Sequence, residues 1–353
     1  MNLSNNGQPH PTPQKRSHKV LELFFQMGLF EVMHRLWPPR LTILAYHRIT
    51  DPHAPGFDTF KPNVSATPAA FAAQMDFMQQ RFNVVSIGDI VAWLRGQHPL
   101  PPRPALITFD DGYRDNLEQA FPILQARRLP AVVFLATDYI GHALPFYWDL
   151  IAYCFHHTSQ DGADLPLAGW QHWSDENGRA AVMMSWLDYL KKLSDDKKWA
   201  LVIRLPQALG VSLSAGAFAR LHLSWDEVRS MVAGGVDMGA HTQSHPILTR
   251  ISLEQARLEA TGSKARIEQE IEHPVVSFAY PNGLPADFNP ALQTMLKQVG
   301  FEAVFTLVPG PARPAEVRQA PLAIRRIFVH YQDTLPRFAA KVMGVPRLLG
   351  RLG

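Results

Sequence analysis

Two adjacent carboxylates, Asp110 and Asp111, stand directly after a run of mostly apolar and β-branched residues at 105–109. Such a run predicts a buried strand, and the Asp-Asp-Gly that follows it predicts a turn with charge at its tip. Adjacent carboxylates repel one another, and a bound metal ion is the simplest way to relieve that repulsion. Asp before Gly is also common in ordinary surface turns, so the pair by itself leaves both interpretations open.

Two histidines four residues apart, His241 and His245, follow a second apolar run at 236–238. If a helical turn follows the strand, both imidazoles face the same side, which is the spacing of paired histidine ligands in zinc enzymes. One such pair by chance is unsurprising among 15 histidines. Together with the carboxylates, however, the pair supplies one carboxylate and two imidazoles, the donor set of catalytic zinc sites that keep a position open for water.

The composition is typical of a soluble globular protein and limits the classes of function. The chain has 353 residues, 46% of them apolar, which is enough for one large α/β barrel or for two domains. The 34 Lys and Arg residues exceed the 31 Asp and Glu residues by only three, too few to indicate a nucleic-acid partner. The single cysteine, Cys154, excludes an intramolecular disulfide and a metal site made of several thiolates.

Strands must position these motifs, and apolar runs predict strands that alternate with helices along the chain. The predicted strands lie at 41–46, 84–86, 105–109, 131–136, 236–238, 275–279, 303–307 and 323–329. Helical spacing predicts helices at 68–82, 87–94, 116–127, 252–272 and 290–299, with a further one that begins at Trp225 behind a Ser224 cap. This alternation predicts a barrel-like parallel sheet with its ligands at the carboxyl ends of the strands. The tryptophan-rich interval 141–222 predicts a mostly helical insertion on the barrel rim.

The two ends of the chain lie outside this pattern. Residues 1–19 are polar and predict a disordered leader without the features of a secretory signal, and residues 346–353 form a basic tail. Residues 20–40 predict an amphipathic helix, which polar residues interrupt too often for it to span a bilayer. Such a helix either contacts an anionic membrane surface through residues 20–37 or packs across the bottom of the domain. We expect a cytoplasmic protein, peripheral to the inner membrane if the first alternative holds.

Three motifs together resemble those of the polysaccharide deacetylase family, which carries the NodB homology domain. They are Thr-Phe-Asp-Asp-Gly-Tyr at 108–113, His-Thr-Gln-Ser-His-Pro at 241–246 and Phe-Ala-Tyr-Pro-Asn-Gly at 278–283. Tyr46-His47-Arg48 and Ser263-Lys264 are similar to segments of bacterial members tied to exopolysaccharide synthesis. The resemblance covers residues 41–345, with the NodB homology core at about 104–345. It implies a distorted (β/α) barrel and metal-dependent removal of acetyl groups from N-acetylated or O-acetylated sugars.

The resemblance also implies a role for each motif. The metal, usually zinc although another divalent ion is compatible, would be bound by Asp111, His241 and His245. Asp110 would be the catalytic base. Contacts with the substrate and its oxyanion would come from Tyr280, Pro281, Asn282 and Tyr113, with the Asn282 N–H facing the oxyanion.

The sequence departs from the family pattern where the base and the acid are concerned. The third motif often begins with an arginine that orients the base, and Ala279 stands there instead. Arginines near other strand ends could supply that charge: Arg326, which we favour, and Arg325, Arg114 and Arg48. The Leu-x-His motif that brings the general acid is absent, which leaves His47 and His330 as candidates. For the tryptophan-bearing motif, Trp148-Asp149 and Trp225-Asp226 are possible stand-ins.

Three functions are compatible with these residues. The first is a zinc-dependent deacetylase of N-acetylated sugars in a polysaccharide, an oligosaccharide or a lipid-linked precursor. The second is an O-acetyl esterase or another C–N hydrolase on the same scaffold. The third is a carbohydrate-binding relative without catalysis, against which Asp110 argues, because a site that only binds does not need a second carboxylate beside the ligand. We expect an acetylated glycan or sugar as the substrate and no nucleic-acid partner.

Overall fold

The apolar run that carries the two carboxylates forms strand β5 (Pro104–Asp111), and every residue of this strand is buried. The structure is a computed structural model that describes residues 21–36, 40–214 and 216–344. Its other strands are β1 (Thr42–Tyr46), β2 (Arg48–Ile49), β3 (Val64–Ala66), β4 (Asn83–Val84), β6 (Ala131–Leu135), β7 (Gly162–Leu165), β8 (Gly169–His172), β9 (Val236–Ala240), β10 (Ser277–Ala279), β11 (Ala303–Pro309) and β12 (Ile324–Phe328). Its helices are α2 (Leu29–Leu36), α3 (Pro68–Arg81), α4 (Ile87–Leu94), α5 (Phe121–Arg127), α6 (Tyr147–His157), α7 (Glu176–Leu190), α8 (Asp195–Val202), α9 (Leu205–Ala208), α10 (Trp225–Ala233), α11 (Leu253–Ile271), α12 (Pro290–Val299), α13 (Pro314–Gln319) and α14 (Leu335–Val342).

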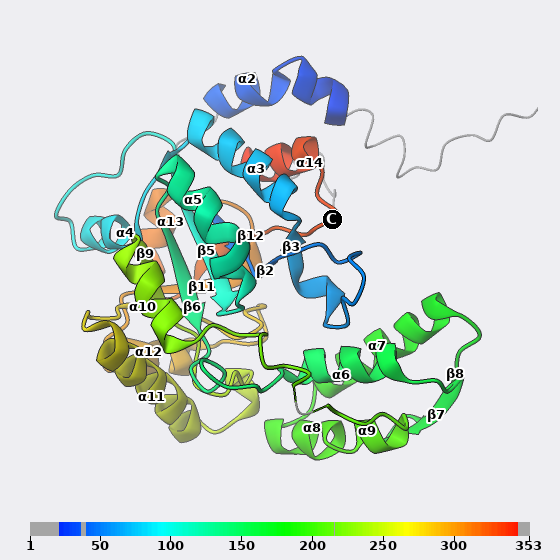
Figure 1. Cartoon of the computed structure of the whole chain (residues 1–353). Helices are drawn as coiled ribbons and strands as arrows, with labels where there is room; N and C mark the ends of the chain where they lie inside the picture. The colour runs from blue at the N-terminus through cyan, green and yellow to red at the C-terminus, as the bar shows by residue number, and fades with distance from the viewer. Residues whose placement is uncertain (1–20, 37–39, 215, 345–353) are drawn as a thin grey trace, which may run out of the picture.

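The main sheet closes into a barrel (Figure 1). Its strands follow the order β1-β12-β11-β10-β9-β6-β5-β4, and β1 also pairs with β5, so that all of them except β4 form a ring. Every pairing in this sheet is parallel. The predicted (β/α) barrel is therefore confirmed, and the carboxyl ends of its strands meet at one rim.

Local sequence signals set the ends of the helices that surround the barrel. The Thr67 side chain accepts a hydrogen bond from the Ala70 N–H at the start of α3. The expected Ser224 cap is confirmed, because Ser224 and Glu227 form a reciprocal capping box at the start of α10. Gly300 ends α12 with a φ of +101°, a conformation in which glycine carries no steric penalty.

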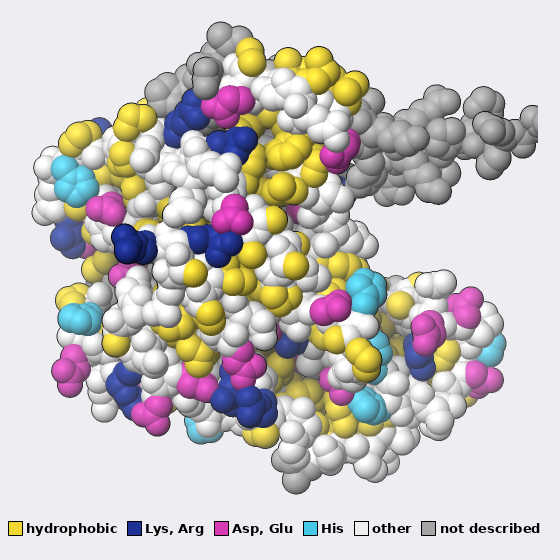
Figure 2. All heavy atoms as spheres, turned by 45° about the horizontal axis from the view of Figure 1, so that its top comes forward, with side chains coloured by type: hydrophobic (Ala, Val, Ile, Leu, Met, Phe, Trp, Pro, Cys, Tyr) yellow, Lys and Arg dark blue, Asp and Glu magenta, His cyan; other side chains and the backbone are white. Residues whose placement is uncertain are grey.

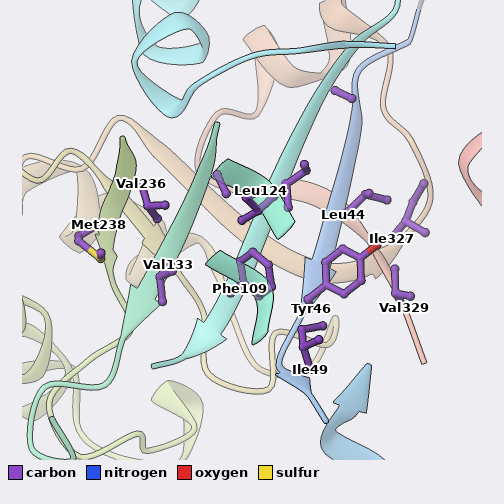
Figure 3. Close-up of a cluster of buried hydrophobic side chains, with 14 of the residues drawn as sticks. Leu44, Tyr46, Ile49, Phe109, Leu124, Val133, Val236, Met238, Ile327 and Val329 are labelled. Atoms are coloured by element: carbon purple, nitrogen blue, oxygen red, sulfur yellow. The ribbon is translucent and has the colours of Figure 1, made fainter. Parts of the chain in front are cut away.

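Alternate residues of each strand face two different apolar layers. Ile43, Leu106 and Phe134 belong to the cluster inside the barrel. Their neighbours along the strands, such as Leu44, Ile107 and Val133, pack outward against helices in a second cluster. Figure 3 shows part of this outer layer, in which Leu44, Tyr46, Phe109 and Val133 lie with Leu124 of α5. A parallel strand buried on both faces explains why these runs are continuously apolar rather than alternating.

A glycine inside the barrel makes room for an aromatic ring near the rim. Gly239 of β9 lies opposite Phe134 of β6, and a β-carbon at Gly239 would lie 2.4 Å from the Phe134 ring. The ring in turn packs against Phe305, with the ring centroids 5.4 Å apart, and lies below the Arg326 guanidinium. Because Gly239 has no β-carbon, the Phe134 ring can pack tightly inside the barrel directly beneath the candidate site.

The interval 141–222 forms a lobe beside the barrel, seen at the lower right of Figure 1. It contains α6, α7, α8 and α9 and also the antiparallel hairpin β7–β8, which the mostly helical prediction missed. The core of the lobe includes Trp148, Trp173 and Trp186 and continues into the barrel side at Phe60 and Tyr113, so most of the tryptophans of the lobe pack rather than face solvent. Trp170 is an exception and is 68% exposed.

The other differences from prediction concern the ends of the barrel domain. The single helix predicted at 20–40 is wrong, because residues 21–26 and α2 are separate helices joined by a turn at Gly28, where φ is +66°. Phe25 packs on Phe77 of α3, with the ring centroids 6.1 Å apart, so one face of this segment covers the barrel domain. No helix within the described ranges is long and apolar enough to cross a membrane. Membrane contact and a cytoplasmic location stay predictions, and residues 1–19 and 346–353 lie outside the described residues.

Three shorter features were not predicted. The pairing of β2 with β3 follows the first barrel strand, α13 lies between β11 and β12, and α14 follows the last strand. Phe338 of α14 packs on Phe77 of α3, with the ring centroids 6.0 Å apart. Phe338 belongs to the outer apolar cluster, whereas Val317 of α13 belongs to the cluster inside the barrel.

Candidate metal centre and active site

The two carboxylates lie at the carboxyl end of β5. The turn predicted for them is wrong in detail, because the strand continues through Asp110 and Asp111, which are in register with Phe134 and Leu135 of β6. Asp111 has a φ of +78°, a left-handed conformation that Asp tolerates better than most residues. This twist at the strand end allows both carboxylates to line the same cleft.

Asp111, His241 and His245 converge on one point. The Nε2 atoms of His241 and His245 lie 3.4 and 3.3 Å from Asp111 Oδ1 and 3.1 Å from each other. Atoms bound at about 2.0–2.2 Å to a tetrahedral ion lie roughly 3.3–3.5 Å apart, so these separations fit a bound zinc ion. Within the described residues this is the one grouping of three or more potential ligands.

The surroundings of the three side chains also fit a metal. Both carboxylate oxygens of Asp111 are buried and have no hydrogen-bond partner among the described residues, which is costly unless another group satisfies them. Burial would raise the pKa of this carboxyl, but His241 and His245 hold the pKa well below its usual range, so Asp111 is ionised. His241 Nδ1 lies 2.7 Å from the Ala279 carbonyl, to which it donates, so that Nε2 is left with its lone pair for a metal.

A loop, and not the predicted helical turn, brings the two histidines together. Thr242 and His245 have φ values of +69° and +60°, and no helix begins until residue 248. Buried Glu259 of α11 holds this loop, because its carboxylate accepts hydrogen bonds from the N–H groups of Gln243 and Ser244, at 2.8 and 2.9 Å. Sequence reasoning missed Glu259, and an acid on the inner face of a long helix is the signal that could have identified it.

Arg326 holds the second carboxylate. Its NH1 and NH2 atoms each lie 2.7 Å from an oxygen of Asp110, and it also donates to the Thr306 carbonyl and to Thr108 Oγ1. The guanidinium is fully buried. Burial alone would raise the pKa of Asp110, but the Arg326 charge outweighs this effect and holds the pKa below its ordinary value. Of the four arginines named from the sequence, Arg326 is the one that holds Asp110, while its role in orienting a catalytic base stays a prediction.

The other three arginines have different partners. Arg48 pairs with Asp115 at 2.8 Å, and Arg114 pairs with Glu227 at 2.6 Å. Arg325 is exposed on the opposite face of β12. Strand alternation explains the difference between Arg325 and Arg326, because adjacent residues of a strand point to opposite faces.

We predict a large loss of stability when Arg326 is replaced by methionine. The Asp110 carboxylate would then be buried without its partner, which costs about 3–5 kcal/mol in the free energy of unfolding. Urea unfolding of the metal-free protein measures this loss. Arg325→Met on the same strand is the control and should change the free energy by less than about 0.5 kcal/mol. Equal losses in both variants, or no recovery when Asp110→Asn is added to Arg326→Met, would contradict the prediction.

His47 is the histidine candidate that lies at the site. Its Nε2 is 4.0 Å from Asp110 Oδ2, it lines the cleft, and its buried Nδ1 has no partner among the described residues. The Ser65 hydroxyl accepts its N–H and the Asn116 side chain donates to its carbonyl, so the backbone around it is fixed. His330 lines a separate hollow beside Tyr331.

The cleft, with a volume of about 350 Å³, is shared between the barrel and the insertion. The barrel side contributes His47, Phe60, Asn63, Asp110, Asp111, His241, His245, Ile247, Asn282, Leu284, Leu307, Pro309 and Phe328. The insertion contributes Tyr147, Trp148, Leu187 and Lys191, of which only Trp148 was singled out from the sequence. The rest were missed because no local pattern reveals that a lobe folds back over the rim.

Three of the expected substrate contacts are wrong. Tyr113 is fully buried, where its hydroxyl donates to Asp149 at 2.7 Å and accepts from Trp148 Nε1 at 2.8 Å. Tyr280 is also buried and donates to the Leu322 carbonyl at 3.1 Å. Neither these tyrosines nor buried Pro281 lines the cleft, whereas Asn282 does. Tyr113 instead helps to fix the Trp148 ring, because its hydroxyl accepts a hydrogen bond from the indole N–H.

Of the two tryptophan pairs considered as stand-ins, Trp148-Asp149 lies at the site. The Trp148 ring packs edge-on against the His245 imidazole, with the ring centroids 4.8 Å apart. Burial raises the pKa of Asp149 to about 6, and its carboxylate also accepts the Phe60 N–H. Trp225 lies instead beneath the Arg266 guanidinium, away from the cleft.

Comparison with known proteins agrees with the arrangement of these motifs. Residues 97–304 match the family described as polysaccharide deacetylase, more than half of the chain. The chain belongs to the polysaccharide deacetylase family. A segment of 98 residues in this chain is 33% identical to the poly-beta-1,6-N-acetyl-D-glucosamine N-deacetylase of Escherichia coli K12. That segment covers 27% of this chain and only 14% of the E. coli protein.

Solved structures show the same fold as this polysaccharide deacetylase family member. The deacetylase PplD of Streptococcus pyogenes, solved in complex with acetate, superposes with a TM-score of 0.57 at 16% identity. The match covers 87% of this chain and 99% of PplD. IcaB from Ammonifex degensii superposes with a TM-score of 0.54 at 20% identity, over 87% of this chain and 98% of that one. At these identities the likeness concerns the barrel and not the chemistry.

Proposed function

We propose that the protein is a metal-dependent hydrolase that removes acetyl groups from N-acetylated sugar units of a polysaccharide, an oligosaccharide or a lipid-linked precursor. One observation carries the proposal. A grouping of three ligand side chains and an ionised carboxylate held by a buried arginine share one cleft. The first three suit a metal, and the fourth suits a base that must not become a ligand.

Asp111, His241 and His245 would hold the metal, with zinc favoured by the mixed oxygen and nitrogen donors. When bound, such an ion polarises the acetyl carbonyl and lowers the pKa of a water molecule. Asp110 would accept a proton from that water as its oxygen bonds to the acetyl carbon. Arg326 keeps the Asp110 carboxylate charged and would keep it from binding the metal, because its NH1 and NH2 atoms each donate to one carboxylate oxygen.

Two further groups complete the reaction. The Asn282 N–H, on the loop after β10, would donate to the oxyanion that forms on the acetyl oxygen. His47, whose Nε2 lies 4.0 Å from Asp110 Oδ2, would give a proton to the sugar nitrogen as the C–N bond breaks, releasing acetate and a free amine. Trp148, Leu187 and Phe328 form apolar walls that suit the faces of a sugar ring.

The name of one relative supports the proposed substrate class. The E. coli relative is named for its action on poly-beta-1,6-N-acetyl-D-glucosamine, and this supports N-acetylglucosamine polymers as the first substrates to test here. An O-acetyl ester would fit the same chemistry, but it would leave a hydroxyl group on the sugar rather than an amine.

The experiment measures acetate release from N-acetylglucosamine oligomers by metal-stripped protein, with and without added zinc. We expect release only with zinc, together with an equal amount of new amine. Release from O-acetylated sugars alone would assign the esterase instead. Tight zinc binding without release from either class would overturn the hydrolase and favour a protein that only binds glycans.

A further inference from the structure

A second hollow, of about 470 Å³, lies between the insertion and the barrel. Figure 2 shows the surface recessed where these two parts adjoin. The insertion lines the hollow with Phe155, His156, Glu176, Asn177, Arg179, Ala180, Met183 and Met184. The barrel side lines it with Lys61, Pro62, His330 and Tyr331. None of these residues belongs to the metal centre.

The hollow continues the catalytic cleft, because the same three segments line both. Phe60 lines the cleft, and the next residues, Lys61 and Pro62, line the hollow. On α7, Leu187 faces the cleft, and Met183, one turn earlier, faces the hollow. After β12, Phe328 lines the cleft, and His330 and Tyr331 line the hollow, with the Phe328 and His330 ring centroids 6.3 Å apart.

The chemistry of the hollow suits a sugar. Tyr331 is a half-buried aromatic wall, and the Lys61 ammonium lies 5.5 Å from its ring centroid. Met183 and Met184 provide an adaptable apolar surface. Arg179 and Glu176, whose side chains lie 4.0 Å apart, provide a donor and an acceptor at the mouth. A pyranose ring has weakly polar faces and hydroxyl groups at its edge, which match a wall of this kind surrounded by charged groups.

We propose that this hollow binds a neighbouring sugar unit of the same glycan chain whose acetylated unit occupies the catalytic cleft. The proposal rests on the proposed function for the identity of the ligand, but the hollow itself is independent of the metal centre. It commits the substrate to an oligomer or polymer, because a monosaccharide would leave the hollow empty. The insertion then sets the preference for chain length.

Ala180 offers a test that leaves the metal centre intact. This exposed residue of α7 lines the hollow, so that Ala180→Trp would fill the hollow without disturbing the core. Ala181 is its exposed neighbour and lines neither the hollow nor the cleft, so Ala181→Trp is the matched control. The substrates are the N-acetylglucosamine monomer, dimer and pentamer in both β-1,4 and β-1,6 linkages.

We expect the wild-type protein to have a KM for the pentamer about tenfold lower than for the monomer. A modest apolar contact with one further sugar ring is enough to strengthen binding by this factor. Ala180→Trp should raise the pentamer KM to the level of the monomer, with kcat unchanged and the monomer kinetics unaffected. Ala181→Trp should behave as the wild-type protein. Tyr331→Ala, which removes the aromatic wall instead of blocking the hollow, should give the same pattern as Ala180→Trp.

Failure of this inference can be distinguished from failure of the proposed function. Acetate release without any preference for length, or a preference that survives both Ala180→Trp and Tyr331→Ala, overturns the second binding site and leaves the hydrolase standing. If no oligomer releases acetate, calorimetric titration of the zinc-loaded Asp110→Asn protein with the pentamer and the monomer decides. Tighter binding of the pentamer that Ala180→Trp abolishes supports the site, and equal binding overturns it.

Discussion

Replacing Asp110 by asparagine should abolish acetate release while the metal stays bound. Asparagine has the shape of aspartate but cannot take a proton from water, so the rate should fall by about 10²–10⁴-fold, the usual contribution of a general base. The candidate metal ligands Asp111, His241 and His245 are untouched. Metal content by elemental analysis and acetate release by an enzyme-coupled assay measure the two quantities on the same sample.

The Asp110→Asn experiment needs two controls. Asp226→Asn removes a carboxylate whose side chain is 90% exposed and should leave the rate unchanged. Unfolding in urea shows how much of the effect comes from stability, because Arg326 loses its charged partner in the Asp110 variant. A variant that keeps more than about a tenth of the wild-type rate would show that another group removes the proton.

Replacing His241 by alanine should remove the metal and, with it, the activity. Loss of a group that only orients a ligand weakens metal affinity by about 10–100-fold, so loss of a ligand should exceed about 100-fold. Thermal unfolding gives a readout that is independent of catalysis. Zinc at about 100 times its dissociation constant stabilises a binding-competent protein by about 2.7 kcal/mol, and this shift should be absent in the variant.

His98→Ala is the matched control for that experiment, because His98 is exposed and outside the cleft. It should show the full shift with zinc. If His241→Ala bound zinc with wild-type affinity, the metal would have to be held elsewhere, and the assignment of Asp111, His241 and His245 as ligands would fail.

The sequence was sufficient to place the candidate ligands at one rim. Asp111 and His241 each follow an apolar run that predicts a strand, and parallel strands bring their carboxyl ends together. The arginine was harder to choose, since four candidates lay near strand ends. Only the register of β12 distinguishes Arg326, which points into the barrel, from Arg325, which points out. A shift of one residue in that register would have exchanged them.

The errors have physical causes of a different kind. Tyr113 and Tyr280 stand within the motifs, and proximity in sequence suggested contact with the substrate, but their side chains pack into the protein and hydrogen-bond there. In place of the helical turn expected between the histidines there is a loop, and the carboxylate that accepts hydrogen bonds from this loop, Glu259, is distant in sequence. The far wall of the cleft could not be predicted, because Lys191 reaches it only through the packing of a separate lobe.

The closure of the barrel has a consequence for the order in which the parts of the site form during folding. Asp110 lies on β5 and Arg326 lies on β12, 216 residues further along the sequence. β12 is the last barrel strand in sequence order. Contacts of such sequence separation form late, because the intervening chain must first be ordered. Until β12 docks between β11 and β1, the carboxylate lacks its counter-charge, and burial alone would favour its protonated form. A partly folded molecule can thus bring Asp111, His241 and His245 together while Asp110, the proposed base, is still protonated and unable to accept a proton.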